Sequence, residues 1–386
     1  FHDWSPLRVF LHRISGTFLF RDGFDDGARL KKGHSPKKRF DSLPEIASRE
    51  LNAYDEALYH STIEESLKIS RNEAMVADAQ EDNIIVNLKA AFPTQFKARH
   101  NYVAIVHADG DNVSQIIKNL RLSKLAKDQE AGLKDFSAKM LQFARVATEK
   151  IVSYGGAPVY MGGDDMLFFA PVANRQEEGK GLEVIFDLVG KLDQLFAEYF
   201  KKYIDEIKAR GKEKPVPSLS YGIDFTYYKF PLYEAKNKSW DLLEHVKSKV
   251  TGKNAINVQL QKHSGQGIPF ILNKSDTDLY KMTLQVIKSG VGKSDFLNSF
   301  TYKLETQAVL LKKIANDAHR LKHFFKNYFN EEYHQHQTFF SQLAEWLQLL
   351  ALQNKDAEHK LTHADFQLIY GTLRFIHFIN SEDKDY

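Results

Sequence analysis

The stretch YVAIVHADGDN (Tyr102–Asn112) decides the fold, because it joins a buried strand to a pair of acidic residues. Its first seven residues, Tyr102–Ala108, are apolar and rich in β-branched side chains, which is typical of a short buried strand. Asp109 and Asp111 follow at the strand end, on either side of Gly110. We expect a helix to open at Asp111, with the carboxylate of Asp111 as its cap.

A second acidic pair lies in YMGGDDMLFF (Tyr160–Phe169). The short apolar runs Ala157–Met161 and Met166–Ala170 predict two strands, and Gly162-Gly163-Asp164-Asp165 between them predicts a hairpin turn, since glycine accepts a positive φ angle. If this hairpin adjoins the strand that ends at Asp109, three carboxylates converge, and like charges at close range require a cation. Oxygen ligands without thiolates favour Mg²⁺ or Mn²⁺ over zinc.

The order of the surrounding elements predicts an α+β fold. Helical and strand patterns alternate after the first strand: helix Leu133–Tyr154, the hairpin, helix Leu182–Lys208, strand Leu219–Tyr227, helix Leu232–Lys249 and a last strand, Ala255–Leu260. This alternation indicates a ferredoxin-like sheet with helices on one face, the layout of nucleotidyl-cyclase and polymerase palms.

Three regions of different texture divide the 386 residues. We predict an N-terminal mixed and helical region over 1–98, a palm over 99–270 and a C-terminal helical bundle over 271–386. A basic run over 29–39 has two interpretations: a solvated loop, or a contact to an RNA backbone. The aromatic pairs of the C-terminal region, Phe324-Phe325 and Phe339-Phe340, are expected in the helix core.

The composition excludes several classes of protein. With no cysteine, the chain has no disulfide, thiolate zinc site, iron–sulfur cluster or cysteine nucleophile. The 53 Lys and Arg residues nearly balance the 50 Asp and Glu residues, so the net charge of +3 does not by itself indicate a nucleic-acid partner. We find no apolar run long enough to span a membrane, and we therefore expect a cytoplasmic protein without a membrane partner.

The pair HADGDN (His107–Asn112) and YMGGDDMLFF resembles the large palm-domain subunit of type III CRISPR–Cas effector complexes, in its Cmr-type form. The resemblance covers roughly residues 40 to 260. Three other segments agree with the family pattern: SLPEIASREL (Ser42–Leu51), LSYGIDFTYYKFPLYEA (Leu219–Ala235) and GKNAINV (Gly252–Val258).

The resemblance implies the residues of a nucleotidyltransferase site. Asp109, Asp164 and Asp165 match the catalytic, metal-binding acids, and two metal ions held there would activate a ribose 3′-hydroxyl and stabilise pyrophosphate. The matching set for binding the nucleotide is Gly110, Asp111, Gly162, Gly163, Ser220, Lys247 and Lys253. The glycines would let the backbone approach a triphosphate. For the two lysines, which resemble the phosphate-binding residues of GGDEF cyclases, a place on the surface of a helix end remains an alternative.

The function that the resemblance implies is RNA-activated synthesis of an adenylate second messenger from ATP, either a cyclic oligoadenylate or an AMP conjugate with S-adenosylmethionine. The implied partners are CRISPR RNA, target RNA and other effector subunits, including a small helical subunit at the C-terminal domain. Two alternatives stay open. A free-standing GGDEF-type cyclase usually has glutamate and phenylalanine where Asp165 and Met166 stand, and a non-catalytic scaffold would not need all three acids.

The sequence departs from the family pattern in three respects. The absence of cysteine means that the family's zinc site is missing. His2-Asp3 spells the HD dipeptide of a nuclease without further ligands, so we predict no nuclease activity from these residues. The chain is also short for the family, and we expect a first palm-like domain to be missing from it. His319 and His323, four positions apart on a helix, are expected to face solvent or a partner.

Overall fold

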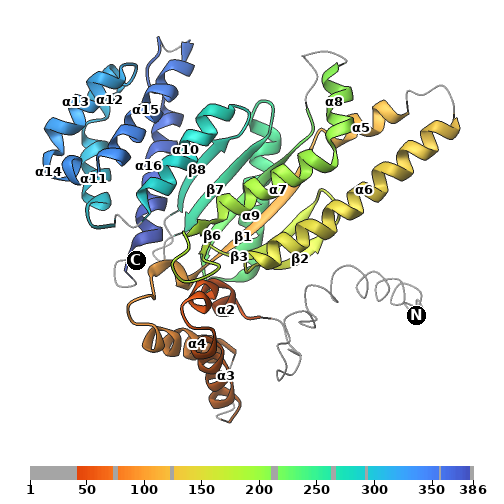
Figure 1. Cartoon of the computed structure of the whole chain (residues 1–386), viewed down its shortest axis with the longest axis horizontal. Coiled ribbons are helices and arrows are strands. Elements are labelled where there is room, and N and C mark those ends of the chain that lie inside the picture. Colours follow the sequence, from red (N-terminus) through yellow and green to blue (C-terminus); the bar gives the residue numbers. More distant parts are fainter. Residues whose placement is uncertain are drawn as a thin grey trace.

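The computed structural model describes residues 41–72, 77–121, 126–209, 216–261, 267–291, 294–355 and 358–382. The basic run at 29–39 and the dipeptide His2-Asp3 lie outside these residues. Within them the fold is α+β, as predicted, with a central sheet between small N-terminal helices and a larger C-terminal group of helices (Figure 1).

The sheet has six strands in the order β2-β3-β1-β6-β7-β8. Their bounds are β2 (Ala157–Met161), β3 (Met166–Pro171), β1 (Tyr102–Asp111), β6 (Ser218–Tyr227), β7 (Ala255–Gln261) and β8 (Gly267–Asn273). All neighbouring pairs are antiparallel except β6 and β7, which are parallel because α9 (Leu232–Lys249) connects them. A separate two-stranded ribbon pairs β4 (Ala173–Asn174) with β5 (Glu183–Val184).

The prediction that the strand over Ala255–Leu260 is the last one is wrong. Strand β8 follows it and forms one edge of the sheet. Its side chains alternate as a strand requires, with Ile268, Phe270 and Leu272 buried. Pro269 between them has no N–H to donate, and this restricts it to an edge strand.

The prediction that the helices cover one face of the sheet is also wrong, because they cover both. On β1, Ala104 and Val106 face the core that contains α6 (Ala126–Ser153) and α7 (Ile185–Tyr199). Val103 and Ile105 face the opposite side, with Ile46 of α2 and Ala235 of α9. Helix α9 lies so close to the sheet that a Cβ on Gly222 would be 2.1 Å from the carbonyl oxygen of Ser239.

The remaining helices flank this layered unit. The predicted helix over Leu182–Lys208 is two helices, α7 and α8 (Lys201–Ala209), with Phe200 as the C-cap of the first. Helix α5 (Val113–Leu120) follows β1 directly. The N-terminal group consists of α2 (Leu43–Ala47), η3 (Arg49–Ala53), α3 (Glu56–Asn72), α4 (Ala77–Ala91) and η4 (Ala98–Asn101).

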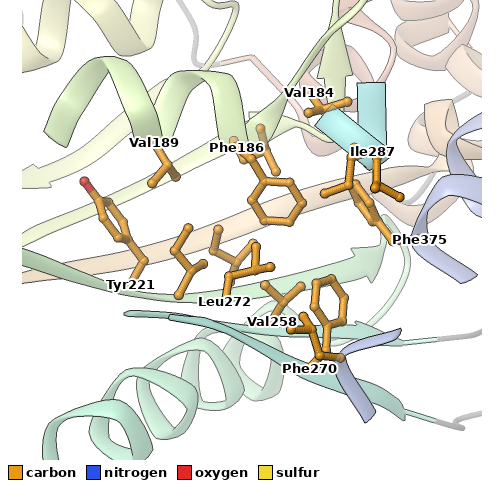
Figure 2. Close-up of a cluster of buried hydrophobic side chains, with 14 of the residues drawn as sticks. Val184, Phe186, Val189, Tyr221, Val258, Phe270, Leu272, Ile287 and Phe375 are labelled. Atoms are coloured by element: carbon orange, nitrogen blue, oxygen red, sulfur yellow. The ribbon is translucent and has the colours of Figure 1, made fainter. Parts of the chain in front are cut away.

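The C-terminal helices share one hydrophobic core with the sheet. They are α10 (Thr277–Gly290), α11 (Ser294–Thr306), α12 (Ala308–Ile314), α13 (Ala318–Tyr328), α14 (Asn330–Gln335), α15 (Gln337–Gln353) and α16 (His363–Asn380). Figure 2 shows Phe375 of α16 beside Phe186 of α7 and Phe270 of β8, with ring centroids of 5.1 and 6.3 Å from Phe375. Because this core is continuous, the predicted boundary between 99–270 and 271–386 remains a prediction.

The aromatic pairs and the two spaced histidines of the sequence lie among these helices. Phe325, Phe339 and Phe340 are fully buried and Phe324 nearly so, which agrees with their assignment to the helix core. His319 and His323 are exposed on α13, and their Nε2 atoms lie 3.3 Å apart. Among the helices that the structure describes, none is long and apolar enough to cross a membrane.

Asp224, in the middle of β6, has a buried carboxyl group that no hydrogen bond from the described residues stabilises. Its side chain has no exposed surface, and neither carboxylate oxygen has a hydrogen-bond partner among the described residues. Burial raises the pKa of Asp224 to about 7, and the charge of Lys238 offsets this only in part. The folded protein therefore keeps this proton to a higher pH than the unfolded chain does.

We expect Asp224→Asn to make the protein more stable at pH 8. In the wild type, the Asp224 carboxyl group contributes most to the free energy of unfolding below about pH 4. This contribution is lost as the pH rises through 7, which lowers the free energy of unfolding by up to about 4 kcal/mol. Urea unfolding of both proteins at pH 5 and pH 8 measures this difference. The same loss of stability between the two pH values in wild type and variant would contradict the assignment.

Candidate active site

The two acidic segments meet where β1 ends beside the turn of the β2–β3 hairpin. In the register of the β1–β3 pair, Ala108 lies opposite Met166, so the turn residues 162–165 lie beside Asp109 and Gly110. A Cβ atom on Gly110 would be 2.3 Å from Oδ2 of Asp164. The side chain of Asp164 thus rests on the backbone of Gly110, and only glycine leaves room for it.

A backbone hydrogen bond closes the hairpin turn, and one of its positions, Gly163, requires glycine. The N–H of Gly162 donates to the carbonyl oxygen of Asp165 at 2.8 Å and closes the turn. Gly163 has a φ of +105°, which L side chains rarely adopt, and a Cβ there would lie 2.7 Å from Met140 of α6. The hairpin prediction is therefore confirmed, and the turn presents Asp164 and Asp165 toward β1.

Mutual repulsion and burial act on the acids of the turn. Burial raises the pKa of Asp164, and the charges of Asp109 and Asp165 raise it further. Burial also raises the pKa of Asp165, again with a contribution from Asp109. The ammonium of Lys247 lowers both pKa values. The site therefore favours any cation that joins these carboxylates.

Lys247, near the end of α9, reaches into this acidic group. Its Nζ lies 2.8 Å from Oδ2 of Asp109 and 2.7 Å from Oδ1 of Asp111. It also donates to the carbonyl oxygens of Asp109 and Gly110, at 3.0 and 2.9 Å. With 12% of its side chain exposed, Lys247 is a residue of the site and does not lie on the surface of a helix end.

The prediction that Asp111 caps a helix is wrong. Asp111 is the last residue of β1, and the N-cap of α5 is Asn112, whose side chain makes no capping hydrogen bond. Asp111 is fully buried and accepts hydrogen bonds from the hydroxyls of Ser218 and Ser220, at 2.9 and 2.6 Å. The Asp111 carboxylate is thus buried among these partners and does not cap α5.

A cleft of about 690 Å³ opens beside the turn, between α5 and α6. Six of the residues that line it were singled out in the sequence or adjoin such residues: Gly110, Asn112, Gly162, Gly163, Asp164 and Lys253. Its apolar wall is formed by Val113, Ile117, Phe136, Met140 and Leu141, with Ser114 and Ser137 as the polar residues. The volume is within the range of clefts that bind small organic molecules.

Three residues of the predicted binding set, Asp111, Ser220 and Lys247, are not among the residues that line the cleft. Ser220 has no exposed surface and donates to Asp111, so here it supports that carboxylate. Asp111 lies beside it. The residues that sequence reasoning missed are those of α6, such as Phe136, Ser137 and Met140. They recur with the one-turn spacing of a helix face, but no motif in the sequence marks that face as opposite the hairpin.

The donor chemistry fits a hard divalent cation, since carboxylate and carbonyl oxygens are the groups offered. Yet the part of the chain that the structure describes contains no group of three or more His, Cys, Asp or Glu side chains placed to hold a metal ion. The ammonium of Lys247 is paired with Asp109 in this structure, at 2.8 Å from its Oδ2. A site with one or two carboxylates is compatible with Mg²⁺, which commonly takes its other ligands from substrate phosphates and water. A site built on all three acids stays a prediction.

Comparison with known proteins finds similarity over the central part of the chain. Residues 102–257 match the family model for Cas10/Cmr2, second palm domain. CRISPR system Cmr subunit Cmr2 of Pyrococcus furiosus is 27% identical over 265 residues, which are 62% of this chain and 28% of the relative. The chain therefore spans little more than a quarter of the length of that curated relative.

Two solved structures also align with part of this chain. A crystal structure of a Csm1–Csm4 cassette in complex with cA4 aligns with a TM-score of 0.43 and 13% identity, over 74% of this chain and 37% of that chain. A cryo-EM structure of a type III-B Cmr-beta complex bound to cognate target RNA also aligns with a TM-score of 0.43 and 13% identity, over 89% of this chain and 48% of that chain.

Proposed function

We propose that the chain, whose residues 102–257 match the model for Cas10/Cmr2, second palm domain, makes an adenylate second messenger from ATP as the palm-bearing subunit of a type III CRISPR effector complex. The relative from Pyrococcus furiosus is a Cmr subunit, which supports the Cmr-type assignment. The observation that carries the proposal is the contact of Asp164 with Gly110 at the mouth of a 690 Å³ cleft.

The acids and the glycines would divide the work of the reaction. Asp109, Asp164 and Asp165 would hold Mg²⁺ or Mn²⁺, which supplies charge neutralisation for an attacking 3′-hydroxyl and for the pyrophosphate that leaves. Gly110, Gly162 and Gly163 line or border the cleft and bring backbone close to the phosphates without a side chain in the way. Alignment and charge are most of what phosphoryl transfer demands of a protein.

The cleft has separate places for the two ends of ATP. Phe136, Ile117 and Met140 form an apolar wall against which a purine base would stack. Lys253 lines the same cleft as Asp164 and the glycines, and its charge would bind the triphosphate. Lys247 would neutralise the other side of the phosphate site from behind Gly110.

The assembly around the chain is part of the proposal. CRISPR RNA and target RNA would bind within the multi-subunit complex, and target RNA would switch synthesis on. A small helical subunit would contact residues 271–386, where Tyr302 is 70% and Val309 74% exposed. We also propose that residues 1–98, 99–270 and 271–386 are separate regions of the chain, and that the protein is cytoplasmic.

The mass of the product tests the proposal. The assembled complex is incubated with labelled ATP, target RNA and Mg²⁺ or Mn²⁺, with and without S-adenosylmethionine. A product whose mass is a multiple of the adenylate unit identifies an oligoadenylate, whereas a product that requires S-adenosylmethionine identifies an AMP conjugate. Product from the isolated chain without RNA would contradict the effector role and favour a free-standing cyclase.

We expect Gly110→Ala to reduce product formation about a hundredfold, since a displacement of about 1 Å at a reacting group costs this much. The new methyl group would collide with Asp164 and with Val113. The matched control is Gly190→Ala in α7, where a Cβ meets nothing within 4 Å. Equal rates for the two variants, measured with labelled ATP, would contradict the close contact of Gly110 with Asp164.

A further inference from the structure

Asp111 has more partners than any other carboxylate of the site, and all of them follow it by more than a hundred positions in sequence. Its Oδ2 accepts hydrogen bonds from Ser218 Oγ at 2.9 Å, Ser220 Oγ at 2.6 Å and the backbone N–H of Asn254 at 3.0 Å. Its Oδ1 pairs with Lys247 Nζ at 2.7 Å. With no exposed surface and this many bonds, the Asp111 carboxylate has one orientation.

The ion pair fixes the end of a flexible side chain. A lysine carries three N–H donors on a four-carbon stem with many rotamers, so an unpaired lysine has no defined position. Lys247 Nζ is held by Asp111 and Asp109 and by the carbonyl oxygens of Asp109 and Gly110. Of these four acceptors, the Asp111 carboxylate is the charged one that is fully buried, so it sets where the ammonium stands.

The same carboxylate holds the loop that carries the second lysine. Gly252, Lys253 and Asn254 all have left-handed backbone, with φ angles of 81°, 57° and 48°. This conformation is unfavourable for the two residues other than glycine, and it persists only when surrounding bonds enforce it. The bond from the Asn254 N–H to Asp111 is one of these, and Lys253 next to it lines the cleft.

We propose that Asp111 is a positioning residue that places both phosphate-binding lysines, Lys247 through the ion pair and Lys253 through the Asn254 amide, and does not itself touch the nucleotide. The inference rests on the proposed function insofar as the lysines bind triphosphate. It assigns Ser218 and Ser220 the task of orienting Asp111, in place of a direct contact of Ser220 with the nucleotide.

The first test does not depend on ATP. The full chain is treated with N-hydroxysuccinimidyl acetate, and the acetylation rate of each lysine is followed by peptide mass spectrometry. In Asp111→Asn we expect Lys247 to react about tenfold faster than in wild type, the lower limit for loss of a hydrogen bond to a charged group. Asp224→Asn is the control, since it removes a buried carboxylate from the same sheet and should leave Lys247 at the wild-type rate. An unchanged Lys247 rate in Asp111→Asn would overturn the proposal.

The second test is the equilibrium affinity of the chain in its complex for ATP and for adenosine. Asp111→Asn should weaken ATP binding about tenfold and leave adenosine binding unchanged, because the lysines face only the phosphates. Adding Asp111→Asn to Lys247→Met should weaken binding less than the two single changes predict together, since both remove the same contact. Equal weakening of ATP and adenosine would show a general loss of structure and overturn the positioning role.

The two readouts separate this inference from the proposed function. If wild type binds no ATP, the proposed function fails, and the acetylation rates still decide whether Asp111 holds Lys247. Should Asp111→Asn fold poorly, Ser220→Ala removes one hydroxyl donor to the Asp111 carboxylate and is expected to shift both readouts in the same direction by a smaller factor. Wild-type values for both readouts in Ser220→Ala would then contradict the proposal.

Discussion

Replacing both turn acids, Asp164→Ala with Asp165→Ala, is expected to abolish nucleotide product, a loss on the order of a thousandfold or more. The change removes the carboxylates that Gly110 and the hairpin turn present to the end of β1. Product formation from labelled ATP by the assembled complex with target RNA is the measurement. Unchanged activity in the double variant would contradict the assignment of the metal-binding acids.

The fold should tolerate this double variant. The turn is closed by a backbone hydrogen bond from Gly162 to Asp165, which needs neither side chain. Burial and the neighbouring charge of Asp109 raise the pKa of both acids, so ionised carboxylates are a cost to the folded state in the absence of a cation. We therefore expect unaltered assembly. Asp205→Ala, on the exposed side of α8, is the control and should keep full activity.

The largest effect on stability is expected from Glu50→Ala. Glu50 has no exposed side-chain surface, and its Oε2 lies 2.6 Å from Arg99 Nη2 and 2.9 Å from His100 Nε2. Burial alone would raise the pKa of Glu50, but the charge of Arg99 and the hydrogen bond with His100 lower it to about 2. Removing the carboxylate would leave Arg99 buried without its counter-charge, at a cost of about 3–5 kcal/mol.

This ion pair also connects distant parts of the chain. Glu50 lies in η3, Arg99 in η4, and Arg99 donates to the carbonyl oxygen of Ile379 in α16. Urea unfolding of the full chain measures the effect, with the exposed Glu177→Ala as a control within about 0.5 kcal/mol of wild type. A loss below about 1 kcal/mol in Glu50→Ala would contradict the account of this cluster.

The pH dependence of stability gives the same cluster a second signature. Because the folded-state pKa of Glu50 lies below its ordinary value, its stabilisation is fully present above about pH 5 and is lost as the pH falls through about 2. The loss amounts to about 3 kcal/mol. Glu50→Gln should show a correspondingly flatter profile over this range.

Local patterns in the sequence were sufficient for most of the sheet and for the acidic turn. The bounds of β2 and α9 coincide with the prediction, because glycines flank the apolar run of β2 and Pro231 stands at the start of α9. The joining of the two acidic segments depended on one assumption, that β1 and β3 are neighbours, and the register of the pair confirms it. The sequence of strand β8 also shows a strand-like alternation, at Ile268, Phe270 and Leu272, so this strand was predictable.

The role of Asp111 could not be read from its neighbours in sequence. A carboxylate at a strand end before a polar residue is typical of a helix cap, and only contacts with Ser218, Lys247 and Asn254 show otherwise. The apolar wall of the cleft was missed for the same reason, since Phe136 and Met140 have the spacing of any buried helix face. Local motifs predicted which charged residues belong to the site, whereas tertiary packing decides which atoms those charged groups contact.

Incubation of the assembled wild-type complex with labelled ATP, Mg²⁺ or Mn²⁺ and matching target RNA tests the central claim most directly. The account predicts a new adenylate product that forms only when target RNA is present. The absence of any nucleotide product with either metal ion, with and without S-adenosylmethionine, would contradict it.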